Sequence, residues 1–382
     1  MHYLTLVAIA KDETRSLREW LVYHTILGVE SFIIYDNDST VPIRETLAPF
    51  LREGFLKVVE ISGQNMQLTA YDHALREFGS TTRWMGFIDL DEFIVPQTTD
   101  DLRHFLTDYE AYAGLAVNWV TYGSSGHVKR PLGLQIESYT RRLPLSDPAN
   151  FHIKSIVKPA YTLHALSPHN FAFRDGCHAV NPDRMPIASA FSPACLDSIR
   201  INHYFFRSQE EFEEKIRRGR ADTDAPELRH RIEDFNDQLN AEHDEDLSAH
   251  KYLEKLKTFL KADSAHEIIA FPRRSIAQDE PGYLSAFVDM TRQGDAVRAE
   301  LVLREALTRF PDNPMLIAVR AGSLRLAGDT AQALAELHRS LGLQPTTQAL
   351  RELAALHAAL GDPETAGKVR AYLDFLVGVE NA

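Results

Sequence analysis

The sequence has little cysteine, no long hydrophobic run and a deficit of positive charge. Only two cysteines, Cys177 and Cys195, occur in 382 residues, too few for a disulfide framework and typical of a reducing compartment. No uninterrupted apolar stretch approaches the roughly 20 residues of a transmembrane helix. Lys and Arg number 41 against 54 Asp and Glu, so the net charge is −13. Such an acidic chain disfavours binding to nucleic acid.

Three common sequence signals are also missing. The apolar run that opens the chain has no Lys or Arg before it and ends at Lys11, Asp12 and Glu13, unlike a signal peptide. Neither Gly-x-Gly-x-x-Gly nor Gly-x-x-x-x-Gly-Lys-Ser/Thr follows it, which disfavours a dinucleotide-binding Rossmann domain and a P-loop NTPase. We therefore expect a cytoplasmic protein, free or peripheral at the inner face of the membrane, without a transmembrane segment or a nucleic-acid partner.

What is present is a regular alternation of strands and helices. Short β-rich segments begin near residues 3, 31, 56 and 84, and segments of helical periodicity separate them. One such helix is predicted over residues 67–78, and Ser16 is the predicted N-cap of the first. This rhythm is typical of βαβ units with a parallel sheet covered on both faces. Residues 115–205 predict a mixed, partly antiparallel region, and residues 207–262 predict charged helices.

The last part of the chain contains an internal repeat. Gly-Asp pairs recur at 294–295, 328–329 and 361–362, spaced by 34 and 33 residues. Pairs of helices with this period resemble tetratricopeptide repeats, and the alternative is a helical bundle with chance spacing. The predicted organisation is an α/β domain over residues 1–265, a linker over 266–282 and an all-α repeat domain over 283–382.

Carboxylates gather where the predicted parallel strands end. Asp89-Leu90-Asp91 follows the fourth strand, and Asp36 follows the second. Ligands of open α/β sheets bind at this edge, and residues i and i+2 of an extended backbone project to the same side. The Asp89–Asp91 pair therefore predicts a site for one hard divalent cation, with positions left open for substrate phosphates. Asp36 has an ordinary alternative, because Asp often starts turns.

With these motifs, the first ~220 residues resemble glycosyltransferases of the GT-A fold, and more specifically glycosyltransferase family 92 and bacterial family-2-like enzymes. The departures are Asp12 and Tyr122, where Asn and Phe are more usual. The resemblance implies a Rossmann-like, mixed α/β sheet that binds a nucleotide sugar, followed here by the helical repeats. The matching segments include Lys11-Asp12-Glu13, Ile34 to Ser39, Trp84 to Phe93, Trp119 to His127, Lys154 to Pro159, His203-Tyr204 and Ser208 to Gly219.

The resemblance also implies roles for individual residues. Asp89, Asp91 and His203 would hold Mn²⁺ or Mg²⁺, because carboxylates and a neutral imidazole are suitable ligands; the alternative for His203 is an ordinary strand-end residue. For Lys215 and Arg218 the alternative is a solvated basic helix face. The implied contacts to the nucleotide sugar are Lys11, Glu13, Asp36, Asp89, Lys154, Lys215 and Arg218.

Two further roles are assigned only to candidates. Trp119 and Tyr122 are candidates for an acceptor-binding wall, because aromatic faces suit sugar rings; the alternative is an aromatic core. Displacement with inversion needs a base at the acceptor hydroxyl. The candidates for this base are Asp175 and His127, followed by Glu92 and His169.

Together these features predict a metal-dependent, inverting glycosyltransferase. It would move a sugar from a nucleoside diphosphate sugar, UDP-linked with galactose as the first guess, to a saccharide or glycolipid acceptor in bacterial-type surface polysaccharide synthesis. The repeats would bind a protein partner or a second copy of the chain. The alternatives are a sugar-nucleotide nucleotidyltransferase, which should carry a Gly- and Lys/Arg-rich loop after the first strand, and a catalytically idle repeat scaffold.

Overall fold

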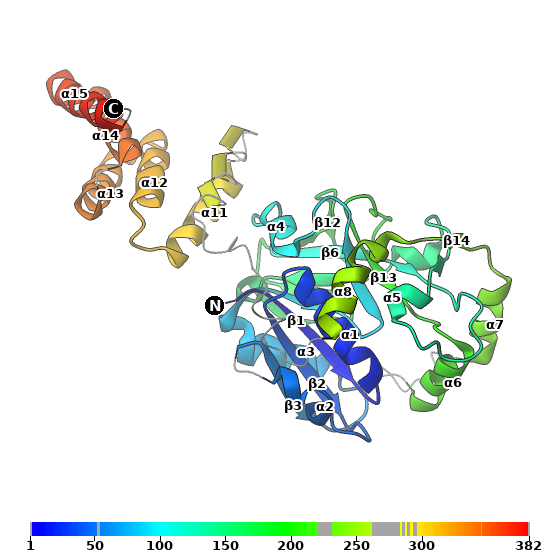
Figure 1. Ribbon diagram of the computed structural model, residues 1–382. Helices are drawn as coiled ribbons and strands as arrows, with labels where there is room; N and C mark the ends of the chain where they lie inside the picture. Colours follow the sequence, from blue (N-terminus) through cyan, green and yellow to red (C-terminus); the bar gives the residue numbers. More distant parts are fainter. Residues whose placement is uncertain are drawn as a thin grey trace. The chain divides into compact units, whose positions relative to one another are not determined.

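The chain forms two compact units, Met1–Arg274 and Ser275–Ala382, and each is described by itself (Figure 1). The predicted linker, residues 266–282, lies outside the described residues, so the predicted domain boundaries stay predictions. The computed structural model describes residues 2–51, 54–219, 231–261, 283–284, 287–288, 291–292, 296–344 and 346–380.

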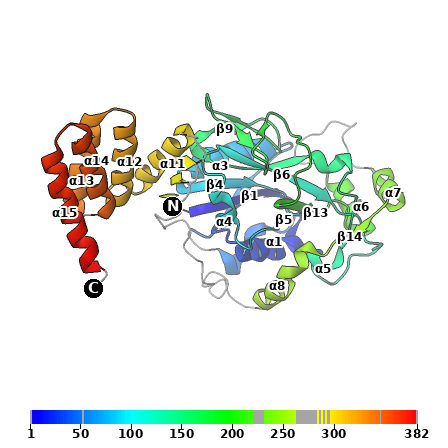
Figure 2. The same cartoon turned by 90° about the horizontal axis from the view of Figure 1, so that it is seen from above.

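The first unit is built on one mixed sheet whose parallel half has the strand order β3-β2-β1-β4. Its strands begin close to the four predicted positions, so the predicted βαβ series is confirmed. The apolar strands need cover on both faces, and helices supply it on opposite sides of the sheet (Figure 2). The elements are β1 (His2–Ala10), β2 (Ser31–Asn37), β3 (Leu56–Ile61) and β4 (Thr82–Phe87), with α1 (Thr14–Ile26) and α8 (Leu253–Leu260) on one side and α3 (Gln67–Phe78) on the other.

The start of α1 differs from the expectation. The helix begins at Thr14, so Ser16 lies inside it and is buried, and the N-cap residue is Glu13, whose side chain makes no capping hydrogen bond. Glu13 is free of this local role because its carboxylate is held by two arginines from distant parts of the chain. The helix therefore starts next to the Glu13–arginine contacts and not at Ser16, the residue that local capping preference favours.

The second half of the sheet is antiparallel in part, as predicted. Strand β8 (Ile153–Val157) lies antiparallel between β4 and β6 (Gly114–Thr121). Strand β13 (Ile199–His203) runs parallel to β6 and antiparallel to β5 (Glu92–Pro96). Because β4 and β5 are joined by the acidic turn 88–91, this pairing places that turn beside the ends of β6 and β13.

Shorter elements complete the first unit. Hairpin β9–β10 packs its strand β9 near α3, and Ala165 and Phe171 of this hairpin join the core cluster between α3 and the sheet. These elements are α2 (Ile43–Thr46), α4 (Leu102–Thr107), α5 (Gln135–Ser138), β7 (Arg141–Arg142), β9 (Thr162–Ala165), β10 (Phe171–Phe173), β11 (Ala179–Val180), β12 (Pro186–Ile187), α6 (Gln209–Arg218), α7 (Ile232–Asn240) and β14 (Asp244–Glu245).

The second unit is helical. Its helices form hairpins, α12 with α13 and α14 with α15, and each hairpin turns at a glycine of positive φ, Gly328 or Gly361, the conformation that favours glycine at helix ends. The all-α region is thus confirmed, while its assignment to the tetratricopeptide class stays a prediction and the pair 294–295 lies outside the described residues. The helices are α11 (Ala296–Arg309), α12 (Pro314–Leu326), α13 (Thr330–Leu343), α14 (Thr347–Ala359) and α15 (Pro363–Glu380).

The predicted fold class, a mixed α/β sheet followed by an all-α region, is therefore confirmed. Among the described residues, no helix is long and apolar enough to cross a membrane.

Candidate functional site

The acidic motif forms a turn, which corrects the expectation of an extended pair. The Glu92 N–H donates to the carbonyl oxygen of Asp89 at 3.1 Å, closing the turn between β4 and β5. Asp89 and Asp91 consequently do not share one partner, as alternating side chains of a strand would. Each carboxylate faces a different lysine.

Asp89 faces a lysine from the neighbouring strand β8. Its Oδ2 accepts a hydrogen bond from Lys154 Nζ at 2.7 Å, and its Oδ1 accepts one from Gln67 Nε2 at 3.0 Å. Lys154 is only 1% exposed, so its ammonium depends on this pairing. Beneath the turn, Glu92 accepts the Asp89 N–H at 2.9 Å and lies 3.6 Å from Lys154. Lys154 is thus held between two carboxylates.

Asp91 faces a lysine from helix α6. Its Oδ2 accepts from Lys215 Nζ at 2.9 Å, and its Oδ1 lies 3.6 Å from Nε2 of His203, the last residue of β13. Burial alone would raise the pKa of Asp91, but Lys215 and His203 outweigh it and hold that pKa well below its usual range. Burial lowers the pKa of His203. The site therefore holds an anionic carboxylate beside a neutral imidazole.

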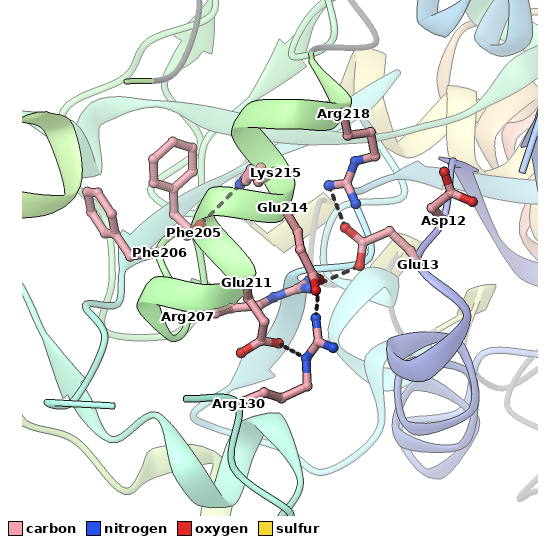
Figure 3. A pocket seen from close by; sticks show the side chains of 10 residues that line it. All are labelled: Asp12, Glu13, Arg130, Phe205, Phe206, Arg207, Glu211, Glu214, Lys215 and Arg218. Atoms are coloured by element: carbon pink, nitrogen blue, oxygen red, sulfur yellow. Dashed lines mark hydrogen bonds and ion pairs between the residues drawn. The ribbon is translucent and has the colours of Figure 1, made fainter. Parts of the chain in front are cut away.

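A pocket lined by four basic and four acidic side chains (Figure 3) includes Lys215, the partner of Asp91. Glu13, which follows β1, binds Arg207 Nη1 at 3.0 Å and Arg218 Nη2 at 2.6 Å. Lys215 lies between this pair and Asp91, and its ammonium also lies 3.9 Å from the centre of the Phe205 ring. Burial opposes the charge of Glu13, but the two arginines lower its pKa overall. One carboxylate thus fixes two guanidinium groups at the pocket wall.

Arg207 is the residue of this pocket that the sequence reasoning missed. It is 8% exposed, and its Nε and Nη2 are buried without a hydrogen-bond partner in the described part of the chain. Its φ of 53° places a non-glycine residue in the left-handed region, a conformation that concentrates at functional sites. The signal was available, because Arg207 lies between His203 and the capping box of Ser208 and Glu211 that starts α6.

The predicted nucleoside residues lie in linked turns at the ends of β1 to β3. Both oxygens of Asp36 accept backbone N–H groups, from Ser39 at 3.1 Å and Ile43 at 2.8 Å, so Asp36 performs the turn function that was its alternative. Lys11 is exposed. The other contacts join adjacent loops: Asp12 Oδ1 accepts from Thr40 N at 2.7 Å, Asp12 N donates to Ser39 Oγ at 3.1 Å, and Asp38 accepts from Ser62 Oγ at 2.7 Å and Gly63 N at 3.1 Å.

The two acceptor candidates occupy different environments. Trp119 is partly exposed, and its ring lies 4.5 Å from that of His203. Tyr122 is 1% exposed and packs against Tyr204 at 4.8 Å. The Tyr122 ring therefore belongs to the core, and the prediction of an acceptor-facing wall is corrected for this residue because its surface is covered.

The two leading base candidates, His127 and Asp175, are not brought to the acidic turn, whereas Glu92 accepts the Asp89 N–H there. His127 Nε2 is hydrogen-bonded to the carbonyl oxygen of Ser138 at 3.0 Å, and its ring packs against Tyr139. Asp175 is exposed in the turn after β10. Within the described ranges, no hydrogen bond or ion pair joins either residue to Asp89 or Asp91, and their catalytic roles stay predictions.

The predicted metal ligands are brought together only in part. Two ligand atoms held ~2.1 Å from one cation lie ~3 Å apart, and the 3.6 Å between Asp91 Oδ1 and His203 Nε2 is close to that. Asp89 is engaged by Lys154 and Gln67, and the described residues contain no group of three or more His, Cys, Asp or Glu able to hold a metal. Asp91 and His203 fit a cation whose remaining ligands are phosphate oxygens and water, as is usual for Mg²⁺ at phosphate sites.

Fold and geometry together define an α/β protein with a candidate ligand site at the carboxyl ends of the parallel strands. The chain belongs to glycosyltransferase family 92, whose sequence model matches residues 8–225.

Similar proteins extend this finding. A family 92 protein of Ricinus communis is 29% identical over 228 residues, 57% of this chain and 38% of that protein, and one of Oryza sativa subsp. japonica is 28% identical over 56% of this chain and 35% of that protein. This chain thus spans little more than a third of the length of these curated relatives. A galactan beta-1,4-galactosyltransferase of Arabidopsis thaliana is 25% identical over 28% of this chain and 23% of that protein.

Among solved structures, S. aureus TarS 1-349 is 15% identical and covers 41% of this chain and 47% of that chain, with a TM-score of 0.30. A score this low carries no argument about function.

Proposed function

We propose that this chain is a glycosyltransferase that moves a sugar from a nucleoside diphosphate sugar to a saccharide acceptor. The observation that carries the proposal is the meeting of Asp91, Lys215 and the arginine pair Arg207–Arg218 at one edge of the sheet, in a chain of family 92. Cations and carboxylates alternate there, and buried donors remain without partners.

Three basic side chains of this pocket have the chemistry of a diphosphate site. A departing nucleoside diphosphate develops negative charge, and prearranged cations stabilise it. Arg207 offers Nε and Nη2, and arginine binds phosphate oxygens in a two-point geometry. Lys215 and Arg218 flank it. These three side chains bind and orient the leaving group in the proposed reaction.

Asp91 and His203 would hold Mn²⁺ or Mg²⁺. When bound, such an ion supplies positive charge that offsets the diphosphate. Lys215 already pairs with Asp91, so the ammonium and a bound cation would share this carboxylate. Lys154 holds Asp89 in place at the rim through their ion pair.

The donor sugar, the product and the stereochemistry of the transfer are proposed from fewer observations. The name of the galactan beta-1,4-galactosyltransferase relative favours UDP-galactose as the first donor to test and a polysaccharide as the product. Inversion by direct displacement, with a base at the acceptor hydroxyl, is the simplest chemistry for such a site. The helical unit would bind a protein partner or a second copy.

Asp91→Asn tests this proposal. The change keeps the side-chain shape and removes the charge that faces Lys215 and His203, so transfer by the folded protein should fall by ~100-fold or more, equivalent to ~2.7 kcal/mol. The melting temperature should also fall, because the largely buried Lys215 loses its counter-ion. The readouts are UDP release from a panel of UDP-sugars and UDP binding by calorimetry with Mn²⁺ or EDTA. Asp108→Asn, at an exposed carboxylate after α4, is the matched control.

The outcomes separate the parts of the proposal. Full transfer in EDTA would contradict the metal role alone. Stabilisation by nucleoside triphosphates and not by UDP would favour a nucleotidyltransferase. A wild-type protein that neither binds UDP nor consumes any UDP-sugar would overturn the proposed function as a whole.

A further inference from the structure

A row of aromatic rings continues outward from the proposed metal ligand. The Trp119 ring lies 4.5 Å from His203 and stacks on His152 at 4.7 Å, with ring planes 14° apart. Phe191 follows, 4.4 Å from His152, and is 53% exposed. With His169, 5.4 Å from Trp119, these residues form what we call the aromatic wall: Trp119, His152, His169 and Phe191.

Backbone hydrogen bonds fix the polar members of the aromatic wall. Trp119 Nε1 donates to the carbonyl oxygen of Ala149 at 2.7 Å, and Nδ1 of His152 bonds the same oxygen at 3.2 Å. Nδ1 of His169 bonds the carbonyl oxygen of Ile153 at 2.9 Å. Because a carbonyl oxygen only accepts, each imidazole carries its proton on Nδ1 and a lone pair on Nε2. In the described part of the chain, no hydrogen bond occupies either Nε2.

The electrostatics of the wall are neutral. Burial lowers the pKa of His152, and burial lowers the pKa of His169 to about 3, so both imidazoles are uncharged near pH 7. The nearest ammonium, that of Lys154, is buried and paired with Asp89. Aromatic surface combined with a few fixed, uncharged acceptors suits a neutral polyhydroxyl ligand, with its C–H groups on the ring surface that the stacking of Trp119 on His152 leaves open and its hydroxyls on the imidazoles. They do not suit a phosphate or an acidic polymer.

We propose that the aromatic wall binds the acceptor as a neutral saccharide chain of two or more sugars, with the growing end near His203 and the next rings toward Phe191. This inference rests on the proposed transferase function and deepens it. The length follows from the path along the wall, because three ring-to-ring steps separate His203 from Phe191, more than one sugar ring can cover.

Phe191→Ala and His152→Ala test the inference in the full-length chain. The probes are β-1,4-linked galacto-, gluco- and N-acetylglucosamine oligosaccharides of one to six units. For the longer members, the acceptor KM should rise about 10-fold, the equivalent of one lost aromatic contact. The KM for the UDP-sugar, the affinity for UDP and the activity toward monosaccharides should not change. Tyr372→Ala, at a ring 48% exposed in α15, is the matched control.

Binding can also be measured without turnover. Trp20 and Trp84 are fully buried, so acrylamide quenching of tryptophan fluorescence reports mainly on Trp119. Saccharides of two or more units should protect Trp119 from quenching, and Phe191→Ala should weaken that protection.

Three results would overturn the inference: no protection by any saccharide in a protein that binds UDP, an acceptor KM independent of chain length, or an unchanged KM in both variants. A protein that fails to bind UDP fails the proposed function itself, and the two failures are thereby distinguished.

Discussion

Two buried ion clusters of the first unit use the same chemical groups in opposite ways. In one, which we call the sealed cluster, Glu110 binds Arg83 Nη2 and Lys158 Nζ, each at 2.6 Å, and also accepts from Tyr3 Oη at 2.6 Å and Trp84 Nε1 at 3.2 Å. All three charged side chains are at most 5% exposed. The other is the site at the acidic turn.

The clusters differ in what is left without a partner. In the sealed cluster both Glu110 oxygens are used, and Lys158 sits over the Trp84 ring. At the acidic turn, Arg207 Nε and Nη2 and His203 Nδ1 have no partner among the described residues, and Asp89 is 34% exposed. Buried polar groups are almost always satisfied, so these unpaired groups mark where a ligand is expected. A cluster whose polar atoms are all paired indicates a role in stability, and a cluster with unpaired polar atoms indicates a role in ligand binding.

The largest expected effect is on the sealed cluster. Glu110→Gln removes the carboxylate that pairs with the buried Arg83 and Lys158, which should lower the free energy of unfolding by ~3–5 kcal/mol. Chemical denaturation measures it. UDP affinity of the folded protein should stay within about twofold. A loss below about 1 kcal/mol, or a selective loss of UDP binding, would remove the distinction between the two clusters.

Arg207→Gln should show the reverse pattern. The variant loses the unpaired guanidinium donors, so UDP affinity should fall about 10-fold or more, the range for hydrogen bonds to charged groups, with a small change in melting temperature because Glu13 keeps Arg218. Calorimetry measures the affinity. Arg141→Gln, at an exposed arginine, is the matched control. Unchanged UDP binding with a large loss of stability would make Arg207 a structural residue.

Glu19 sharpens the comparison because it is buried and forms no ion pair with any residue that the structure describes. It accepts the N–H groups of Gln135 at 2.8 Å and Ile136 at 3.2 Å, and burial raises its pKa from 4.5 to about 7. The folded state thus holds its proton more tightly than the unfolded state. The stability from this group is complete below about pH 4.5 and is lost as the pH rises through about 7.

Glu19→Gln should therefore flatten the dependence of melting temperature on pH between about 4.5 and 7. Thermal unfolding of both proteins across this range measures the difference. Parallel curves would contradict the raised pKa of Glu19.

The smallest effect is expected from removing the helical unit. Both ion clusters lie within Met1–Arg274, so residues 1–275 should fold alone and keep the UDP affinity of the full chain within about twofold. The truncated protein should lose self-association or activity on a large acceptor. An insoluble or molten product without UDP binding would show that the two units fold as one.

Strand positions were predictable because burial on both faces demands continuous apolar runs. The segments near residues 3, 31, 56 and 84 became β1 to β4, and the helix over 67–78 became α3. Strand β5 was not predicted, because Glu92–Pro96 is read as a strand only through its antiparallel partner β13. The local sequence pattern thus predicts β1 to β4, whereas β5 depends on pairing with a strand that is distant in the sequence.

Site residues were predictable as a group and less so in their pairing. Asp91, His203 and Lys215 do converge, whereas the i, i+2 argument for Asp89 and Asp91 was wrong because it assumed an extended backbone where the chain turns. Tyr122 was misplaced because an aromatic residue in a β-rich segment has the same sequence pattern in a core as on a wall. Arg207 was missed although it lies between His203 and the capping box that starts α6, because its unpaired donors appear only in the folded chain.

Hydrogen bonds join the loops after β1, β2 and β3. Asp12 bonds Thr40 and Ser39 of the next loop, and Asp38 bonds Ser62 and Gly63 of the loop after that. This interlock sets a rule for engineering donor preference. A loop grafted from a relative at one position would leave its neighbour's donors and acceptors unmatched, so the unit of exchange is the set of three loops, and chimaeras that replace a single loop should be the ones that fail to express.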